Sequence, residues 1–199
     1  LYERDKSFAD RSQGYGLTLQ QASKAIKGFG LFSLKEAIVS TKHIVHTSDG
    51  KIIGEWGLRK WLPSDTKKQA KHSNLHISRQ ALRSDLLNQL DENNSVKWGH
   101  QLVDFKESEN NIDLSFQVNG EIKKVQTDIL VGSDGIRSSV RKLLLGEEIA
   151  PLRYLDCMVI LGICKLSALE NTQSPLLDGA TVFQTANGKE RIYMMPYSK

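Results

Sequence analysis

The chain has 199 residues, of which 39% are hydrophobic and 25% are charged, and this suits one large domain or two small ones with a packed core. Its 27 basic and 23 acidic residues leave a net charge of only +4, and the lysines are scattered, which favours an ordinary solvated surface over the one-sided basic face of a nucleic-acid-binding protein. No secretory signal and no apolar run approaching ~18 residues occurs, so we expect no membrane span and take the cytoplasm as the default compartment.

The first residues read as the apolar end of a strand followed by charge. In dinucleotide-binding folds, an acidic residue at the end of the second strand binds the adenosine ribose, roughly 20 residues after a glycine-rich turn. Glu3 fits that role, and a solvated glutamate in a charged turn is the alternative. Because no G-x-G-x-x-G motif occurs and the first residue is Leu1, we expect the first strand, its glycine loop and the first helix to lie upstream of this fragment.

Two glycines, Gly14 and Gly16, mark a loop within residues 11–19, and a short helix is expected over residues 19–27. Gly28 and a second glycine two residues later would end this helix, as glycines often do at helix C-termini.

A hairpin is predicted next, because residues 42–46 and 52–56 read as strands on either side of Asp49-Gly50, a favourable turn. His43 and His46 would face opposite sides of their strand. Since no third ligand is evident for a metal, packed or solvated histidines are expected.

The polar, aperiodic residues 63–73 predict a loop, and residues 75–77 then form a short strand. Ser78 is a suitable N-cap for a helix that reaches about residue 90. This helix carries an apolar stripe of Leu82, Leu86, Leu87 and Leu90. Arg79 projects into that stripe, and a guanidinium on a buried face needs an anionic partner. The partner is either a carboxylate or a ligand phosphate, and the sequence leaves both open.

A meander of strands is predicted from residue 96 to residue 130. The expected strands are residues 96–98, 101–105, 112–118 and 122–127. The third alternates apolar and polar residues, which predicts one buried face. Asn119-Gly120 is a strong hairpin turn between the last two.

The meander leads into a strand that begins near residue 128, and Asp134-Gly135 then turns the chain. Ser138 opens a helix that runs to about residue 145. A carboxylate at the C-terminal edge of a strand lies where open α/β sheets bind ligands. Alternatively Asp134 only caps the helix, since turns favour both Asp and Gly.

The remaining chain predicts more strands. Residues 154–165 read as one apolar strand that carries Cys157 and Cys164 on opposite faces, so we expect both cysteines in the core and no disulfide between them. A hairpin is expected at Asn187-Gly188, between strands over residues 181–184 and 191–195.

Three of these stretches resemble one family. Residues 130–141 resemble the "DG motif" of the FAD-dependent aromatic hydroxylases, the flavoprotein monooxygenases similar to p-hydroxybenzoate hydroxylase. The stretch Tyr2-Glu3-Arg4 resembles the point where that family holds the ribose. The stretch Ile77-Ser78-Arg79, followed by Leu82, resembles the site of an arginine that contacts FAD.

The resemblance implies a set of cofactor-binding residues and no catalytic side chain or metal ligand. In the family, the loop that matches residues 13–16 passes over the flavin, backbone near Leu102 lies beside the adenine, and the DG motif serves the flavin and the approach of the nicotinamide. The implied residues are Glu3, Gln13, Gly14, Gly16, Arg79, Leu102, Asp134, Gly135, Ser138 and Arg141. Arg83 does not match the motif and is expected to have a structural role.

The implied fold is α/β, with an incomplete Rossmann-like FAD-binding domain of the glutathione-reductase type interleaved with part of a β-sheet substrate domain. Residues 1–38 and 74–149 would form the first domain, and residues 39–73 and 150–199 the second. The family's later Gly-Asp motif does not occur, so we expect the C-terminal half to be missing as well.

The implied function is hydroxylation of a small organic substrate, aromatic or ring-containing, by FAD, with NAD(P)H as co-substrate and O2, through a flavin hydroperoxide. The cofactor carries this chemistry, and no Ser-His-Asp order or carboxylate pair suggests otherwise. One alternative is another FAD-dependent oxidoreductase, such as a reductase, an epoxidase or a halogenase. The other is a fragment that binds no cofactor and acts only as an interaction module. The substrate, the choice of NADH or NADPH and the oligomeric state are not specified.

Overall fold

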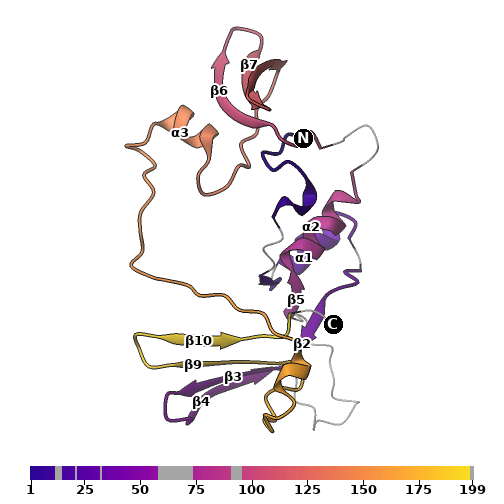
Figure 1. Cartoon of the computed structure of the whole chain (residues 1–199), viewed down its shortest axis with the longest axis vertical. Coiled ribbons are helices and arrows are strands. Elements are labelled where there is room, and N and C mark those ends of the chain that lie inside the picture. The colour runs from indigo at the N-terminus through magenta and orange to yellow at the C-terminus, as the bar shows by residue number, and fades with distance from the viewer. Residues whose placement is uncertain (12–14, 21, 32, 58–73, 91–95, 198–199) are drawn as a thin grey trace. The chain divides into compact units, whose positions relative to one another are not determined.

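The chain folds into two compact units in a computed structural model that describes residues 1–11, 15–20, 22–31, 33–57, 74–90 and 96–197 (Figure 1). Unit 1 comprises Leu1–Ser12 and Leu90–Ile160, and unit 2 comprises Gln13–Gln89 and Leu161–Lys199. The loop predicted over residues 63–73 and the candidate residues Gln13 and Gly14 lie outside the described residues.

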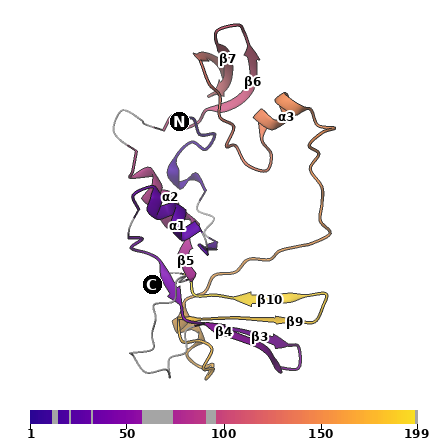
Figure 2. The same cartoon turned by 180° about the vertical axis from the view of Figure 1, so that it is seen from behind.

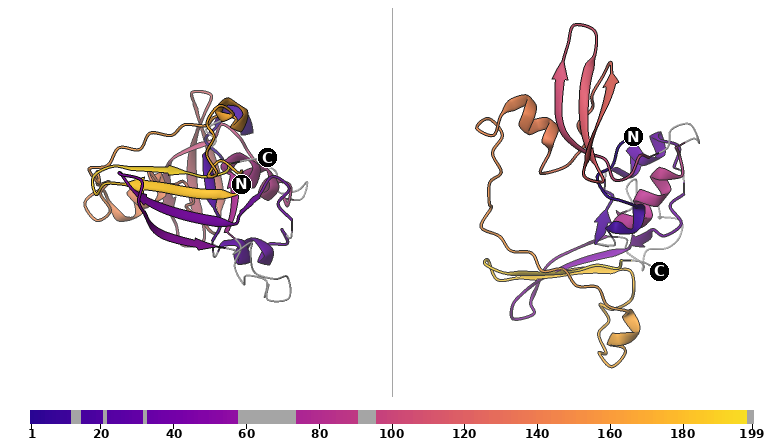
Figure 3. Two further views of the ribbon diagram at one scale, coloured as in Figure 1. Left: turned by 90° about the horizontal axis from the view of Figure 1, so that it is seen from below. Right: turned by 45° about the horizontal axis from the view of Figure 1, so that its top comes forward.

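An antiparallel meander forms the centre of unit 1, as predicted. Its strands are β6 (Gln101–Glu107), β7 (Ile112–Val118) and β8 (Glu121–Thr127), in the order β6-β7-β8, and they lie side by side in Figure 3. Asn119 and Gly120 both have positive φ (51° and 89°), which is the backbone of the favoured two-residue hairpin turn.

The predicted alternation along β7 is also confirmed. Leu114, Phe116 and Val118 are the buried residues of unit 1's core, whereas Gln117 between them is exposed. Leu102 of β6 pairs in register with Phe116 and packs on the same core. One face of the sheet is therefore apolar and covered.

The N-terminal residues join this core through a short parallel contact. Tyr2 forms an isolated parallel bridge with Lys97, and the Glu3 amide donates a 3.0 Å hydrogen bond to the Lys97 carbonyl. The Tyr2 ring stacks on Phe116 with 4.3 Å between centroids. The strand predicted over residues 96–98 is thus reduced to this bridge, and a short 3₁₀ helix, η1 (Phe8–Asp10), follows.

Two predicted strands do not form. Residues 128–131 and 154–165 have no strand structure, and their apolar side chains are largely exposed, at 77% for Val131 and 89% for Ile160. Cys157 and Cys164 are exposed free thiols, so the prediction that they lie in the core is wrong. Apolar β-branched sequence becomes a strand only when another strand pairs with its backbone, and no described residue pairs with either segment.

Unit 2 contains a small antiparallel sheet with two helices. The strands are β1 (Gly16–Thr18), β5 (Asn74–Ser78) and β2 (Ile38–Ser40), in the order β1-β5-β2, and the helices are α1 (Ala22–Gly28) and α2 (Arg79–Leu87). Leu19, Ile26, Leu31 and Ile77 form its buried core. α1 confirms the predicted short helix, and Gly30 follows its end with a φ of 82°.

α2 confirms the predicted helix but is shorter than expected. It ends at Leu87, with Asn88 as C-cap, instead of reaching residue 90. Leu82 packs against the core, whereas Leu86 is 41% exposed. The apolar stripe is therefore only partly buried, since Leu82 packs on the core and Leu86 and Leu90 are exposed.

A four-stranded mixed sheet brings together two segments that are far apart in the sequence. Its strands are β3 (Lys42–Thr47), β4 (Ile52–Gly57), β9 (Thr181–Ala186) and β10 (Arg191–Met194), in the order β10-β9-β3-β4. The predicted hairpins β3–β4 and β9–β10 are confirmed, and β3 pairs with β9 in parallel. Figures 1 and 2 show this sheet from opposite sides.

The fold is thus mixed α/β with several sheets. The Rossmann-like parallel sheet and the expected domain boundaries stay predictions. Among the described residues, none of the helices has both the length and the apolar run that crossing a bilayer requires.

Candidate cofactor site

The loop at Asp134 caps the helix that follows it, α3 (Ser139–Leu145). The Asp134 carboxylate accepts hydrogen bonds from the backbone amides of Ser139 (2.6 Å) and Val140 (3.2 Å) and from the Ser138 hydroxyl. The Ser138 Oγ accepts a 3.0 Å bond from the Arg141 amide. Together these oxygens satisfy amides that a helix start leaves without partners.

Glycine and arginine complete the same loop. Gly135 has a φ of 82°, a conformation that favours glycine. The Arg141 guanidinium donates back to the Ile136 carbonyl. A Cβ on Gly132 would lie 2.7 Å from Cβ of Val140, so the loop lies directly against the helix. All four DG-motif residues therefore hold one turn in a fixed shape.

The hydrogen bonds also keep the Asp134 carboxylate ionised. Desolvation by burial raises the pKa of Asp134, but the hydrogen bonds from the Ser138 hydroxyl and from the Val140 and Ser139 amides outweigh it and leave the pKa below its ordinary value. Asp134 is consequently a negative charge at neutral pH, at the N-terminus of α3.

We expect Asp134→Ala to destabilise unit 1 by about 1 kcal/mol, the usual cost of losing an N-cap. Urea denaturation followed by circular dichroism measures the change. Asp128→Ala, at an exposed aspartate in the same segment, is the matched control and should leave stability unchanged. Equal effects of the two substitutions would contradict the capping role.

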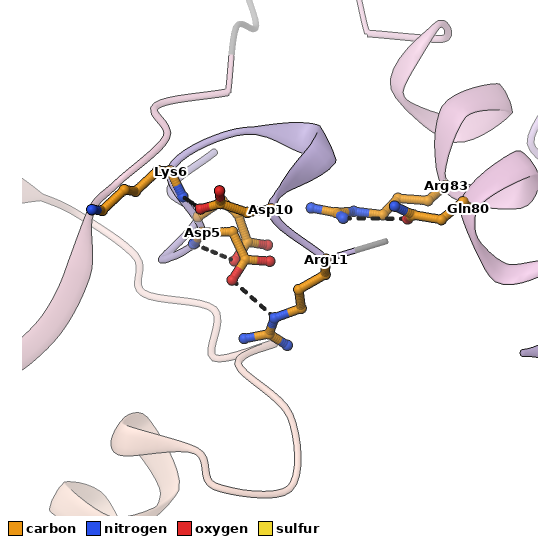
Figure 4. A network of polar contacts seen from close by, with 7 residues as sticks. Asp5, Lys6, Asp10, Arg11, Gln80 and Arg83 are labelled. Atoms are coloured by element: carbon orange, nitrogen blue, oxygen red, sulfur yellow. Dashed lines mark hydrogen bonds and ion pairs between the residues drawn. The ribbon is translucent and has the colours of Figure 1, made fainter. Parts of the chain in front are cut away.

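Glu3 lies in a tightly held N-terminal segment. Its carbonyl accepts a 2.9 Å bond from the His100 amide, and its half-buried side chain accepts a 3.3 Å bond from the Asp5 amide. The neighbouring acids are engaged locally: Asp5 pairs with Arg11 at 2.9 Å, and Asp10 accepts from the Lys6 amide at 2.6 Å (Figure 4). Glu3 has no ion pair with a described residue.

Three of the candidate positions are grouped in unit 1. Tyr2 beside Glu3, Leu102, and Leu130 just before the Asp134 loop all pack on one core. β6, which carries Leu102, also contacts α3. The structure thus brings the ribose candidate, the adenine candidate and the DG loop around one small hydrophobic core.

Arg79 begins α2 in unit 2. Its amide donates a 3.0 Å bond to the Tyr15 carbonyl, and its half-buried guanidinium lies 5.9 Å from the centre of the Tyr15 ring. No described carboxylate pairs with it. Arg83, one turn on, donates to the Gln80 side chain at 3.5 Å (Figure 4). Of the two partners that the sequence left open for Arg79, a protein carboxylate is not found in the described part of the chain. A ligand phosphate remains as the other expected partner.

Gly16 lies beside Arg79 because β1 pairs with β5, with Gly16 in register with Ser78. A Cβ at Gly16 would lie 2.7 Å from Met195 and 3.2 Å from Tyr197, so only glycine fits there without a shift. The candidate loop and the candidate arginine are thus neighbours in unit 2. Convergence of Glu3, Arg79 and Asp134 on one ligand stays a prediction.

A buried histidine cluster in unit 2 was not predicted. His76 is fully buried and hydrogen-bonded to Thr18 at 3.0 Å, while its Nε2 has no partner among the described residues. His43 Nε2 lies 3.0 Å from Ser40 Oγ and 3.1 Å from Asn74 Nδ2. Desolvation by burial lowers the pKa of His43. The pKa of His76 is lowered to about 4, mainly by desolvation and then by the charge of the nearby His43.

The sequence offered one signal for this cluster, since His76 stands between two apolar residues of a predicted strand. Its burial depends on β1 and β2, which flank β5 from distant parts of the chain. Within the described ranges, no group of three or more His, Cys, Asp or Glu side chains that could hold a metal ion occurs.

No family model and no curated protein matches the chain, but solved structures do. It resembles HpxO of Klebsiella pneumoniae complexed with FAD and uric acid, with a TM-score of 0.66 and 14% identity over 98% of this chain and 46% of that one. It resembles 2,6-dihydroxypyridine-3-hydroxylase from Arthrobacter nicotinovorans, with a TM-score of 0.57 and 18% identity over 73% and 33%. It also resembles the flavin-dependent monooxygenase PieE in complex with FAD and substrate, with a TM-score of 0.53 and 18% identity over 72% and 27%.

The fold is that of the FAD-dependent hydroxylases and monooxygenases, as the resemblance in the sequence implied. The chain spans less than half the length of each of these proteins, from 27% of PieE to 46% of HpxO.

Proposed function

We propose that this chain is part of an FAD-dependent monooxygenase that hydroxylates a small organic substrate, aromatic or ring-containing, with NAD(P)H and O2. The likeness to HpxO bound to FAD, which extends over 98% of the chain, carries the proposal. FAD would supply the oxygen chemistry: one oxygen atom enters a C–H bond of the substrate, the other leaves as water, and NAD(P)H provides two electrons.

The proposed cofactor residues divide by chemistry. Glu3 accepts hydrogen bonds from the ribose hydroxyls, as acidic residues do in dinucleotide folds. Arg79 pairs with the phosphates, which suits a half-buried guanidinium that has no carboxylate partner among the described residues. Leu102 backbone lies beside the adenine.

The DG loop would serve the flavin through its shape. The side-chain oxygens of Asp134 and Ser138 accept hydrogen bonds from amides at the start of α3, so we assign both residues to positioning the loop. Arg141 would fix the turn, and Gly135 would leave room for the ligand. The loop of Gln13, Gly14 and Gly16 would cover the ribityl chain and the ring edge. No side-chain nucleophile is required.

The proposed function also implies a division of the chain into two domains. Residues 1–38 and 74–149 would belong to the FAD-binding domain, and residues 39–73 and 150–199 to the substrate domain. The pairing of β3 with β9 supports this grouping, because it joins both segments of the proposed substrate domain in one sheet.

Arg79→Ala in the full-length protein that carries this chain should weaken FAD binding by about tenfold, as expected for the loss of a charge-assisted contact with a phosphate. Flavin content after purification and titration with free FAD measure the effect. Arg83→Ala, one turn along α2, is the control and should retain FAD. Unchanged flavin content in Arg79→Ala would remove Arg79 from the cofactor site.

Product analysis separates this function from a reductase, epoxidase or halogenase. With ¹⁸O2, a hydroxylase places one labelled oxygen in an alcohol or phenol product, an epoxidase forms a labelled epoxide, and a reductase or halogenase leaves the organic product unlabelled. A flavin absorbance scan addresses the interaction-module alternative: we expect weak or absent FAD binding by the isolated chain and a yellow full-length protein.

A further inference from the structure

Unit 2 contains an open cavity of about 1020 Å³ with a mostly apolar lining. Ligand pockets of about 300–1,000 Å³ hold drug-sized molecules, so this volume suits a ligand with more than one ring. Phe183 of β9 and Met194 of β10 line it, together with Leu169 and Leu177 from the segment that precedes β9.

The described lining has few polar side chains and one charged residue. Lys165, at the start of η3 (Leu166–Leu169), is the charged member among the described lining residues, and no carboxylate is present among them. Lys165 has no ion pair with a described residue. Tyr197 adds a phenolic hydroxyl. One positive charge without a negative charge complements an acidic group better than a cationic one.

The cavity adjoins the loop that we assign to the flavin. Met195 and Tyr197 both line it, and both lie against Gly16, where a Cβ would come within 2.7 Å and 3.2 Å of them. A ligand in the cavity is therefore close to β1.

We propose that this cavity is the substrate site and that it takes an apolar, ring-bearing organic anion whose acidic group pairs with Lys165. The inference rests on the proposed function for the reaction, but the binding itself requires no flavin. Methionine and phenylalanine side chains bury the rings, because flexible thioethers and aromatic faces pack well on flat apolar ligands. Lys165, which is exposed, selects the anion, because it is the one charged residue in the described lining.

Calorimetric titration of the chain with 2-naphthoate and with neutral 2-naphthamide tests the proposal. The anion should bind about tenfold more tightly than the amide, the difference expected for one charge-assisted contact. Lys165→Gln should remove that preference. Lys189→Gln, at an exposed lysine of the β9–β10 turn, should retain it. Met194→Trp, which fills the cavity, should abolish binding of both compounds while circular dichroism confirms folding.

Equal affinity for the two compounds, a preference that persists in Lys165→Gln, or no saturable binding would overturn the proposal. These outcomes are independent of the flavin. A full-length protein that binds FAD and hydroxylates a neutral substrate would preserve the proposed function and reject only the anionic substrate. If the full-length protein binds 2-naphthoate but no flavin, the anion site is supported and the proposed function is rejected.

Discussion

Gly57→Ala should destabilise unit 2 by about 3 kcal/mol, because it adds backbone strain to a steric clash. Gly57 is the last residue of β4 and has a φ of 131°, which side chains other than glycine's rarely adopt. Its added Cβ would clash with the carbonyl oxygen of Thr41 and would lie 2.9 Å from Cα of Lys42. Both are backbone atoms, at the residue before β3 and at its first residue, so no rotamer change relieves the contact.

Urea denaturation followed by tryptophan fluorescence measures this loss, since Trp56 lies next to the substituted residue. Gly54→Ala is the control in the same strand: its Cβ would meet only side-chain atoms, the nearest 3.5 Å away on Trp56, and stability should change little. Similar denaturation midpoints for the two variants would show that the end of β4 does not have the described backbone.

Acidification is the second change with a large expected effect. The pKa of His76 is about 4 in the folded chain and 6.5 in an exposed histidine. Between these values the unfolded chain binds the proton more readily, so stability is fully present above pH 6.5 and falls as the pH decreases toward 4. The shift corresponds to about 3 kcal/mol once the pH is below both values.

The pKa of His76 is low because protonation would place a charged imidazole in the protein interior, away from water. His76 is fully buried, and its ring centre is 6.3 Å from that of His43, which stacks on Trp56. Denaturation midpoints measured from pH 7.5 to pH 4 should fall steeply in the wild type and less steeply in His76→Gln. A midpoint that is flat in the wild type down to pH 4.5 would contradict the burial of a neutral His76.

Local sequence chemistry predicted the turns well. The hairpins at Asp49-Gly50, Asn119-Gly120 and Asn187-Gly188 follow from residues that adopt positive φ at little cost, and each forms. Ser78 caps α2 as expected, by accepting a bond from the Ala81 amide. These features depend on neighbours in the sequence, so the sequence alone identifies them.

Features that depend on distant partners were harder to predict. Residues 128–131 and 154–165 have strand-like composition but no pairing segment among the described residues, and composition does not reveal whether a partner exists. The burial of His76 requires β1 and β2 on either side of β5. The parallel pairing of β3 with β9 joins residues more than a hundred positions apart, and local patterns contain no sign of it.

The sequence predicted some features of the candidate site more fully than others. The cap formed by Asp134 was the structural alternative in the sequence, and the structure confirms that capping while leaving the proposed cofactor role untouched. For Arg79, the choice between a carboxylate and a ligand phosphate needed the arrangement of neighbouring side chains, which the sequence does not contain. Tyr15 beneath the guanidinium was not expected.

A crystal structure of the full-length protein grown with FAD is the most direct test of the central claim. We predict one FAD molecule with its ribose hydroxyls on Glu3, a phosphate within hydrogen-bond distance of the Arg79 guanidinium, and its flavin end against the Asp134-Gly135 turn. An FAD molecule bound elsewhere, with these three side chains on separate surfaces, would contradict it.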